Sequence, residues 1–248
     1  MSKRFRIAVV GCGDIAGFVA LVCKSLAGIS ISACVSKEKK DALAFAKKNR
    51  VPDVFDDYEE LLQNKSSFDA VYLSTPHHLH APMIRSAISL GIPILCEKPI
   101  AQDLDTAIEI VNDVEQLNRK VGINYQYRYN PYCQKLIAYA QHDIGQIHYV
   151  QINIPWHREP EYFNLSNWHK RIATAGGGTL LTQGSHFLDI ALLAVDSKPI
   201  SAAGITAQKV FNQSDIEIED YAHAVITTQK GTHIEITSSM VAYPQQSA

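Results

Sequence analysis

Small residues gather near the N-terminus at a spacing that lets the backbone come close to a phosphate group. Gly11, Gly13 and Ala16 occupy the three small-residue positions of a G-x-G-x-x-G/A pattern. The first glycine permits a tight turn, the second allows close approach of a pyrophosphate, and the third position lets a helix pack on a strand. Asp14 and Ile15 would begin that helix, whose free N–H groups and dipole favour an anion. The spacing predicts a dinucleotide-binding loop, with a plain tight turn as the alternative.

A second candidate is the lysine of the triplet Glu97-Lys98-Pro99. The proline fixes the turn, so the lysine cannot be drawn back into the apolar run before it. An ammonium group held there can bind an oxyanion or donate a proton, and the neighbouring carboxylate can perturb its pKa. A surface ion pair is the alternative. The setting predicts a catalytic role for Lys98.

A third candidate is a histidine in the glycine-rich segment 176–189. Helical spacing places Thr182 and His186 at i and i+4 on one face, with Asp189 three positions further on. Gly184 allows close approach to that face. Because imidazole titrates near neutrality, His186 can act as a general acid or base toward a hydroxyl group. A buried structural histidine is the alternative.

The residues about 20 positions after the glycines bear on the choice of cofactor. NAD-selective sites have an Asp or Glu there, whereas this chain has Ser36 and Lys37. Lys39 and Lys40 follow at the start of a predicted helix, where cations are unfavourable unless an anion offsets them. A 2′-phosphate is such an anion, so the pattern favours NADP over NAD. A solvated charged face is the alternative.

Alternating strand and helix patterns in the first half provide the frame for these residues. Apolar runs rich in Val and Ile predict buried parallel strands over residues 6–10, 29–35, 69–73, 92–96 and 120–124. Helical periodicity lies between them, over residues 15–26, 39–48, 57–62, 81–90 and 103–119. Gly91 is expected to end the fourth helix in a left-handed conformation. The order predicts an α/β fold with a Rossmann-type, doubly wound parallel sheet.

In the second half of the chain the apolar residues recur with a different period. After a helix that begins at Pro131, residues 146–154, 200–210, 220–229 and 231–241 alternate apolar and polar side chains. This alternation predicts an antiparallel sheet with one wet face. One long helix over residues 179–195 is expected to cover the other face. We expect an NAD(P)-binding domain over residues 1–123 and an α+β domain with a mainly antiparallel open sheet over residues 124–248.

Polar residues follow the ends of the predicted parallel strands. Ligands bind beyond the carboxyl ends of the strands in an open parallel sheet, so these residues are candidate contacts. Besides the glycine loop, the expected cofactor contacts are Ser36, Lys37, Ser74, Thr75, Pro76, His77, His80, Glu97, Lys98, Gln126 and Arg128. His77 and His80 are expected to line the cofactor crevice.

Composition argues against several other classes of function. Lys and Arg total 23 against 25 Asp and Glu, a net charge of −2, so no strong field attracts nucleic acid or an anionic membrane. The five cysteines form no CxxC pair and no signal peptide is visible, which predicts a reduced, cytoplasmic protein. The apolar stretch 7–23 is interrupted by glycines, so no membrane span is expected. The histidines near position 78 lack carboxylate or Cys partners at ligand spacing, so no metal site is expected.

Five motifs in order carry a family resemblance. They cover residues 10–16, 75–80, 96–100, 126–131 and 176–189. Together they resemble the Gfo/Idh/MocA family of NAD(P)-dependent oxidoreductases, over a match that runs from about Arg6 to the C-terminus. The resemblance implies a Rossmann domain followed by an α+β domain whose open sheet bears the substrate and often mediates oligomer contacts. It also implies that Lys98 and His186 are the catalytic lysine and histidine.

One position departs from the family's pattern. The family commonly has an acid four residues before the catalytic histidine, where this chain has Thr182. The run Thr182 to His186 is similar to the Asn-Gln-Gly-x-His variant of some sugar-nucleotide members, which also lack the acid. Thr182 can hydrogen-bond a substrate hydroxyl but cannot act as a carboxylate base. Gln183 beside it is a further candidate for substrate binding.

An aromatic and basic loop bears on the substrate. Residues 156–158, 162–163 and 168–171 resemble the loop that approaches the substrate in sugar-oxidising members of the family. Aromatic faces suit the apolar side of a sugar ring, and Arg158 or Arg171 could bind a carboxylate or phosphate. Stabilisation of the loop and the domain interface by Trp156 and Trp168 is the equal alternative. The expected substrate contacts are Lys98, Tyr127, Arg128, Arg158, Tyr162, Trp168, Thr182, Gln183 and His186.

These observations predict hydride transfer between nicotinamide and a secondary alcohol or ketone of a sugar, polyol or nucleotide-sugar. The chain is shorter than family members, so we expect an incomplete C-terminal domain and an open sheet edge that is covered or paired, as in a homo-oligomer. Two alternatives remain. Thr182 and the shortened C-terminal portion suggest a catalytically impaired dinucleotide-binding sensor or partner subunit. A redox-neutral sugar-converting enzyme that uses bound NAD shares every motif.

Overall fold

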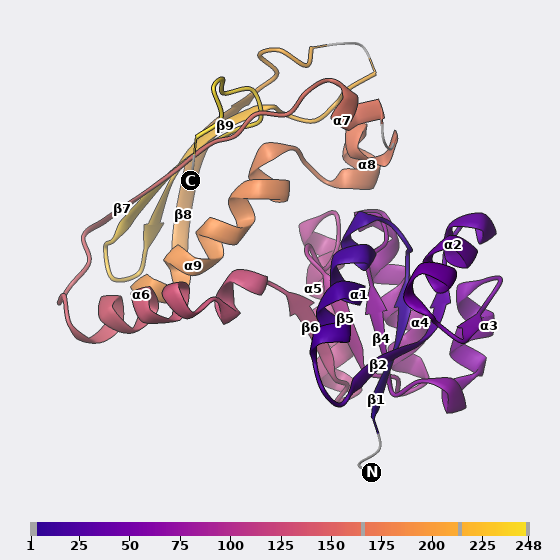
Figure 1. The fold of residues 1–248 in the computed structure, drawn as a ribbon. Helices are drawn as coiled ribbons and strands as arrows, with labels where there is room; N and C mark the ends of the chain where they lie inside the picture. The colour runs from indigo at the N-terminus through magenta and orange to yellow at the C-terminus, as the bar shows by residue number, and fades with distance from the viewer. Residues whose placement is uncertain (1–3, 165–166, 213–214, 247–248) are drawn as a thin grey trace. The chain divides into compact units, whose positions relative to one another are not determined.

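A computed structural model describes residues 4–164, 167–212 and 215–246 (Figure 1). The chain divides into two compact units, Met1–Asn124 and Tyr125–Ala248, which we call unit 1 and unit 2. Each unit contains one sheet and the helices that pack on it. No helix in the described part of the chain is long and apolar enough to cross a membrane.

Unit 1 is built on a six-stranded parallel sheet in the order β3-β2-β1-β4-β5-β6. Its strands are β1 (Phe5–Val10), β2 (Ile29–Val35), β3 (Asp53–Val54), β4 (Ala70–Leu73), β5 (Ile94–Glu97) and β6 (Val121–Asn124). The strand order reverses between β1 and β4, which is the topological switch point of a doubly wound sheet. The predicted fold of the first half is therefore confirmed. Only β3 is missing from the prediction, because two residues are too few to show a period.

The helices of unit 1 lie where the periodicity predicts them. They are α1 (Asp14–Ser25), α2 (Lys39–Asn49), α3 (Tyr58–Gln63), α4 (His80–Ser89) and α5 (Leu104–Gln116). The side chains of Asp57 and Asp103 accept hydrogen bonds from the backbone N–H groups of Glu60 and Thr106, so α3 and α5 begin one residue after these caps. Gly91 has φ of +73° just beyond α4, as predicted for a helix end.

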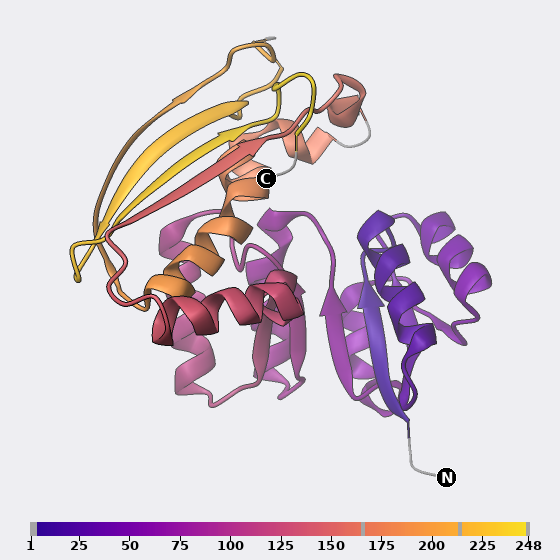
Figure 2. The same ribbon diagram turned by 60° about the vertical axis from the view of Figure 1, so that its left-hand side comes forward.

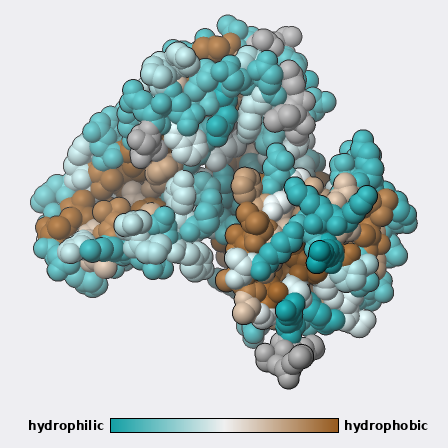
Figure 3. Space-filling model, in the orientation of Figure 1, coloured by the Kyte–Doolittle hydropathy of each residue, from teal (hydrophilic) through white to brown (hydrophobic). Residues whose placement is uncertain are grey.

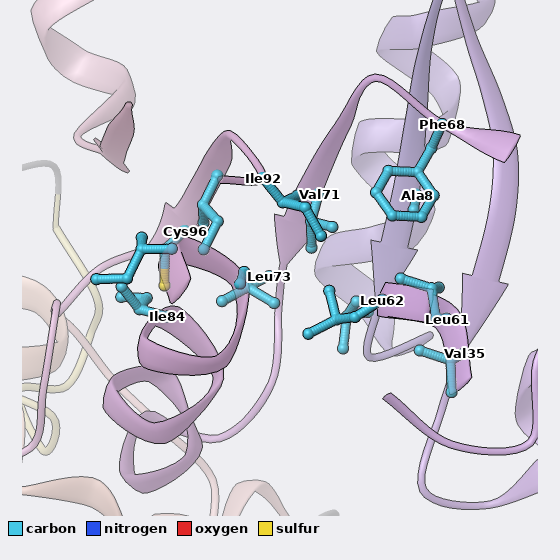
Figure 4. Packing of buried hydrophobic residues seen from close by; sticks show 14 of the residues in the cluster. Ala8, Val35, Leu61, Leu62, Phe68, Val71, Leu73, Ile84, Ile92 and Cys96 are labelled. Carbon is cyan, nitrogen blue, oxygen red and sulfur yellow. The ribbon is translucent and has the colours of Figure 1, made fainter. Parts of the chain in front are cut away.

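Alternate residues of the strands feed two apolar clusters, one on each face of the sheet. Ala8 and Val71 pack with α3, α4 and α5, and this cluster includes Leu61 and Ile84 (Figure 4). Val9 and Tyr72 belong to the opposite cluster, with α1 and α2. Because both faces are covered, the strands are apolar on both sides, which explains the continuous apolar runs in the sequence.

Helix α1 is apolar on its outer side as well. Ala16 and Ala20 are fully buried against the sheet, whereas Phe18 and Leu21 are each 67% exposed. The space-filling view shows hydrophobic surface on unit 1 (Figure 3). The glycine loop at the start of this helix therefore borders an apolar surface.

Unit 2 contains a mixed sheet of four strands in the order β7-β10-β9-β8 (Figure 2). They are β7 (Tyr149–Pro155), β8 (Pro199–Ala207), β9 (Tyr221–Thr228) and β10 (His233–Ser239). The β8–β9 and β9–β10 pairs are antiparallel, but β10 and β7 are parallel. The predicted, mainly antiparallel sheet is confirmed, with β7–β10 as its parallel pair. Alternating polarity reveals a wet face without revealing strand direction.

The helices of unit 2 are α6 (Pro131–His142), α7 (Glu161–Asn164), α8 (Ile172–Ala175) and α9 (Ser185–Val195). The predicted single helix over residues 179–195 is wrong in one respect, because its first part, Leu180–Gly184, is a π-helical turn that leads into α9. Ala191 and Val195 of α9 pack on Ile154 and Ile236 of the sheet. The predicted helix cover over one sheet face is thus confirmed.

Candidate active site

The glycine loop follows β1 in a conformation that requires glycine at its first position. Gly11 has φ of +87°, and a Cβ there would lie 2.7 Å from the backbone oxygen of Ser74. At Gly13 a Cβ would meet no atom within 4 Å, because this residue borders an open groove of about 730 Å³. Ala16 is fully buried. The two glycines therefore serve different purposes: the first closes the turn and the second leaves space beside the backbone.

The N-terminus of α1 is open at this loop. Gly13 is its N-cap residue and gives no side-chain cap, and Asp14 and Ile15 in the first turn are exposed. The loop is tied to β2, since the backbone N–H of Cys12 lies 3.5 Å from the Oγ of Ser36. Free N–H groups at a helix end, next to open space, suit a pyrophosphate. The residues present therefore fit the dinucleotide that the sequence predicts.

The lysines after β2 differ in their surroundings. Lys37 and Lys40 are exposed, and Lys39 forms an ion pair of 2.5 Å with Asp56. This pair raises the pKa of Lys39, first through the hydrogen bond and then through the charge of Asp56. Asp56 therefore offsets the charge of one of the three lysines. Ser36 and Lys37 stand at the end of β2, where a ribose 2′-substituent is expected.

The loop after β4 holds two buried histidines. His77 is 6% exposed, and His80 is fully buried. The two ring nitrogens of His80 lie 2.6 Å from the carbonyl oxygen of Pro99 and 2.8 Å from that of Thr75. Burial lowers the pKa of His80, against the raising effect of these two hydrogen bonds. The ring thus ties the β4 and β5 loops together rather than lining an open crevice.

The remaining residues of the β4 loop stay close to the glycine loop. The Oγ of Ser74 donates to the carbonyl oxygen of Gly11 over 2.8 Å, and Pro76 caps the short turn His77–Leu79 that leads into α4. Thr75 lies between them and is partly exposed. The polar ends of β1 and β4 therefore meet at one edge of unit 1, as the strand order predicts.

Lys98 follows β5 at the same edge and is partly buried. Burial lowers its pKa to about 8, although the neighbouring Glu97 carboxylate acts in the opposite direction. The Lys98–Pro99 peptide bond is cis. A lysine with such a pKa exchanges protons readily near neutral pH, which suits an acid, a base or an oxyanion partner.

The Glu97 carboxylate is held by two neighbouring strands. Its Oε1 accepts a hydrogen bond of 2.7 Å from the side-chain amide of Asn124 in β6 and another from the hydroxyl of Tyr72 in β4. Burial and the charge of Glu97 raise the pKa of Tyr72, so its hydroxyl remains a donor. Neither Tyr72 nor Asn124 belongs to the site predicted from the sequence.

In unit 2, His186 lies in the first turn of α9 and is 8% exposed. Tyr127 lies 5.2 Å from it between ring centroids, and Tyr125 lies 5.9 Å away with its ring nearly perpendicular. Both tyrosines come directly after the boundary between the units, at the start of unit 2. The imidazole is therefore set among aromatic rings, where it is largely shielded from water. Tyr127 is a predicted site residue, and Tyr125 is an additional neighbour.

The segment before His186 is fixed by a glutamate distant in the sequence. The Glu219 carboxylate accepts from the backbone N–H groups of Gly178, over 2.6 Å, and Leu180, over 3.1 Å. The carbonyl oxygen of Glu219 accepts from Thr179 over 3.1 Å. A Cβ at Gly178 would lie 1.8 Å from that carbonyl oxygen, so glycine is required there.

The π-helical turn places Thr182 and Gln183 differently. The Oγ1 of Thr182 donates its proton to the carbonyl oxygen of Gly178 over 2.7 Å. Gln183 is 4% exposed, and its Oε1 accepts from Thr179, which also contacts Ser238 at 2.7 Å. The structure therefore places Gln183 in a buried polar cluster. π-Helical turns of this kind frequently occur at functional sites.

Gln126 and Arg128 belong to unit 2, in a short turn after the boundary. Arg128 makes a two-pronged ion pair with Asp189 of α9, with distances of 2.7 and 2.5 Å. Its guanidinium also lies 5.3 Å from the centre of the Tyr125 ring. Arg128 thus fixes the tyrosine segment against the helix that carries His186, and Gln126 is exposed beside it.

The two candidate arginines of the aromatic and basic loop have different partners. Arg158 lies over the rings of Trp156 and Tyr162, 5.6 Å from each centre. Arg171 instead pairs with Glu217 over 2.7 Å. Trp168 stacks on His169, with 3.7 Å between ring centres. Arg158 is therefore the better candidate for an anionic substrate group, since aromatic rings do not neutralise its charge.

Among residues 4–164, 167–212 and 215–246, no group of three His, Cys, Asp or Glu side chains could hold a metal ion. The five cysteines are free thiols.

Comparison with known proteins assigns the chain to a family. The Gfo/Idh/MocA model described as an oxidoreductase family with an NAD-binding Rossmann fold matches residues 5–125, and the Gfo/Idh/MocA C-terminal domain model matches residues 134–248. The chain belongs to the Gfo/Idh/MocA family. The predicted resemblance is confirmed in both units, and unit 1 is the NAD-binding Rossmann domain of this family.

Individual Gfo/Idh/MocA relatives are distant. The uncharacterized oxidoreductase YrbE of Bacillus subtilis is 24% identical over 92% of this chain and 64% of its own length. An inositol 2-dehydrogenase of Arthrobacter sp. is 26% identical over 95% of this chain and 67% of its own. The crystal structure of the WlbA dehydrogenase from Bordetella pertussis, in complex with NADH and UDP-GlcNAcA, superposes with a TM-score of 0.90 at 23% identity, covering 98% of this chain and 72% of that one. The chain thus spans less than two thirds of YrbE.

Proposed function

We propose that this protein is an NAD(P)-dependent oxidoreductase that interconverts a secondary alcohol and a ketone on a sugar, polyol or nucleotide-sugar. Membership of an oxidoreductase family supports the reaction type. The names of the inositol 2-dehydrogenase and of the WlbA complex support a substrate rich in hydroxyl groups. The observation that carries the proposal is Lys98, a partly buried lysine with a pKa of about 8 at the edge of unit 1 where the glycine loop lies.

The glycine loop and the strand ends of unit 1 are the proposed cofactor site. Gly11, Gly13 and the open N-terminus of α1 would hold the pyrophosphate, and Ser36 and Lys37 would contact the adenosine ribose. When bound, the dinucleotide supplies the hydride chemistry. Because no carboxylate follows β2 at the ribose position, we expect NADP to bind more tightly than NAD. Titration of the protein with each oxidised dinucleotide tests this, and tighter binding of NAD⁺ would contradict it.

Lys98 and His186 are the proposed catalytic residues. His186 would exchange the proton of the substrate hydroxyl, because the imidazole side chain is the commonest general acid or base in enzymes. Lys98 would steady the negative charge that develops on the substrate oxygen. Thr182 would accept a hydrogen bond from a substrate hydroxyl through its Oγ1, whose own proton is donated to Gly178. Its hydroxyl would take the place of a carboxylate without acting as a base.

The aromatic loop is the proposed substrate contact. Tyr127, Tyr162 and Trp168 offer ring faces to a sugar, and Arg158 offers a charge to a carboxylate or phosphate. We therefore expect anionic sugars or nucleotide-sugars to be better substrates than neutral polyols. We also expect a cytoplasmic homo-oligomer paired through unit 2, which sedimentation would detect.

The decisive test compares Lys98→Ala and His186→Ala with the wild type, following the absorbance of reduced nicotinamide with a panel of polyols, sugars and nucleotide-sugars. Both variants should lose at least about 100-fold in turnover. Their affinity for the dinucleotide should stay within about threefold of the wild type. Lys47→Ala and His142→Ala, which change exposed residues, are the matched controls. Full turnover in both catalytic variants would reject the assignment.

The same assay separates two other candidates, which Thr182 favours because the usual acid is absent. A dinucleotide-binding sensor or partner subunit would bind the cofactor without turnover of any substrate. A redox-neutral enzyme would convert its substrate without net reduction of the dinucleotide, so product analysis must accompany the absorbance.

A further inference from the structure

Three neighbouring strands of unit 1 bring a tyrosine, a glutamate and an asparagine together beneath the end of the sheet. The strands β4, β5 and β6 are adjacent, and Glu97 and Asn124 are direct partners in the β5–β6 register. Tyr72 lies one strand away, two residues below the level of Glu97, because it pairs with Leu95. Its side chain covers that distance, and its hydroxyl reaches the Glu97 carboxylate.

Both donors meet the same oxygen of Glu97. The Oε1 atom accepts from the Tyr72 hydroxyl and, over 2.7 Å, from the Asn124 amide. Tyr72 is 2% exposed, so its hydroxyl needs a partner within the protein. Two donors on one carboxylate oxygen fix its orientation. The arrangement therefore fixes the position of the Glu97 charge at the end of β5.

That charge stands immediately before Lys98. Burial disfavours the charged lysine, and the Glu97 carboxylate is the opposing influence. The other titratable groups of these elements do not compete for this role. Burial raises the pKa of Tyr72 and of Cys96, so both stay neutral near pH 8, and burial lowers the pKa of His80, whose ring lies between two carbonyl oxygens. The Glu97 carboxylate therefore favours the ammonium form of Lys98.

The geometry points to Tyr72 and Asn124 as positioning residues, which hold the Glu97 carboxylate in place so that Lys98 stays charged for the reaction. The inference rests on the proposed function only in assigning the charged lysine to catalysis. The hydrogen bonds themselves lie within unit 1. If the role of the two side chains were purely structural, they would contribute to packing alone. Loss of the hydroxyl of another buried tyrosine would then have the same effect as Tyr72→Phe.

Unit 1 offers a matched control for that alternative. Tyr58 is also shielded, and its hydroxyl donates to the carbonyl oxygen of Met83 over 2.8 Å. Its pKa is raised mainly by burial, as for Tyr72. Tyr58→Phe therefore removes the hydroxyl of a partly buried tyrosine that does not touch Glu97. Glu97→Gln is the complementary variant, because the amide oxygen can still accept hydrogen bonds while the charge is lost.

The experiment measures the protonation of Lys98 directly, without a substrate. The intact protein is labelled with trace acetic anhydride at a series of pH values, and mass spectrometry gives the acetylation of the peptide that contains Lys98. The midpoint is the pH at which acetylation of this peptide is half-maximal, and it is expected at about 8 in the wild type. It should fall by roughly one pH unit in Glu97→Gln and by roughly half a unit in Tyr72→Phe and Asn124→Ser. Tyr58→Phe should leave it unchanged.

Turnover provides the second readout. A fall of half a unit from a midpoint near 8 would lower the charged fraction of Lys98 about twofold at pH 8 and hardly at all at pH 6. Tyr72→Phe should therefore lose activity at pH 8 and keep it at pH 6. A structural defect would lower activity at both pH values. Asn124→Ser, at the end of an edge strand, keeps the test available if Tyr72→Phe does not fold.

The outcomes separate this inference from the proposed function. If Tyr72→Phe and Asn124→Ser leave the midpoint where Tyr58→Phe leaves it, the positioning role is overturned, whatever the enzyme does. If the midpoint falls as expected but Lys98→Ala retains full turnover, the network stands and the catalytic assignment of Lys98 fails.

Discussion

The two units of this protein position their candidate site residues by different means. In unit 1 they follow the carboxyl ends of parallel strands, so the sheet itself brings Gly11, Ser74 and Lys98 to one edge. In unit 2 the position of His186 depends on contacts between segments far apart in the chain. The main ones are the hydrogen bonds that the Glu219 carboxylate accepts from the backbone of residues 178–180. A repeated topology gives a site that short patterns reveal. A site held by single long-range contacts leaves little trace in local sequence.

The largest loss of stability should come from a substitution at Gly178, where the carbonyl oxygen of Glu219 leaves no room for a Cβ. In Gly178→Ala, the new Cβ would lie 1.8 Å from the carbonyl oxygen of Glu219, so that segment must move and its hydrogen bonds to residues 178–180 must break. We expect a loss of about 3 kcal/mol or more in the stability of unit 2. Thermal unfolding measures the loss, and hydrogen exchange should locate it in unit 2.

Gly177→Ala is the matched control. Its Cβ would meet the side chain of Leu181 at 3.3 Å, a contact that a small shift relieves. The control should cost less than about 1 kcal/mol. If both variants unfold alike, the contact with Glu219 does not define the start of this helix, and the comparison between the units fails.

A smaller loss of stability, confined to unit 1, is expected for substitutions in the glycine loop, and it should differ between Gly11 and Gly13. Gly11→Ala combines a φ of +87° with a Cβ 2.7 Å from the backbone oxygen of Ser74, so we expect about 2 kcal/mol of destabilisation and loss of dinucleotide binding. Gly13→Ala meets no atom within 4 Å, so its stability should change by less than about 1 kcal/mol. Its dinucleotide affinity should still fall at least about tenfold, because the methyl group would occupy the space expected for the pyrophosphate.

Thermal unfolding and dinucleotide titration on the same samples check this pair. Equal destabilisation by the two substitutions would contradict the claim that only Gly11 is required for the conformation of the loop. Unchanged affinity in Gly13→Ala would remove the pyrophosphate from the proposed position.

Much of the fold follows from the sequence because its patterns are local. Buried parallel strands need apolar residues on both faces, and amphipathic helices need a 3.6-residue period, so β1, β2 and α5 are visible without a structure. The strand β3 is too short for any period. The parallel pairing of β7 with β10 is equally hidden, because strand direction depends on the path of the chain between them.

The candidate site is predictable to a similar extent. Lys98 and His186 stand out by their neighbours in the sequence, the proline and the glycines. Tyr72 looks like one more apolar strand residue, and only the register of three strands reveals that its hydroxyl reaches Glu97. Glu219 lies 41 positions from Gly178, so no local pattern connects them. A buried tyrosine within reach of a strand-end carboxylate is the one signal that could have been used.

The smallest effect concerns a histidine of unit 2 whose protonation opposes folding. His169 lies against Trp168 and Tyr162, and burial lowers its pKa to about 4. An unfolded histidine titrates near 6.5, so between about pH 6.5 and 4 the unfolded chain binds more protons than the folded one. Stability must therefore fall as the pH falls through this window, and it should be unaffected above it.

Partial exposure of the ring reduces this contribution, which we expect to reach about 1 kcal/mol at pH 5. His169→Phe keeps an aromatic ring in the stack and removes the titrating group. Denaturant unfolding at pH 7.5 and pH 5 should therefore show a smaller acid loss in this variant than in the wild type. His142→Gln, which changes an exposed histidine at the end of α6, should leave the wild-type difference intact. If His169→Phe shows the same acid loss as the wild type, burial against Trp168 and Tyr162 does not lower the pKa of His169 as expected.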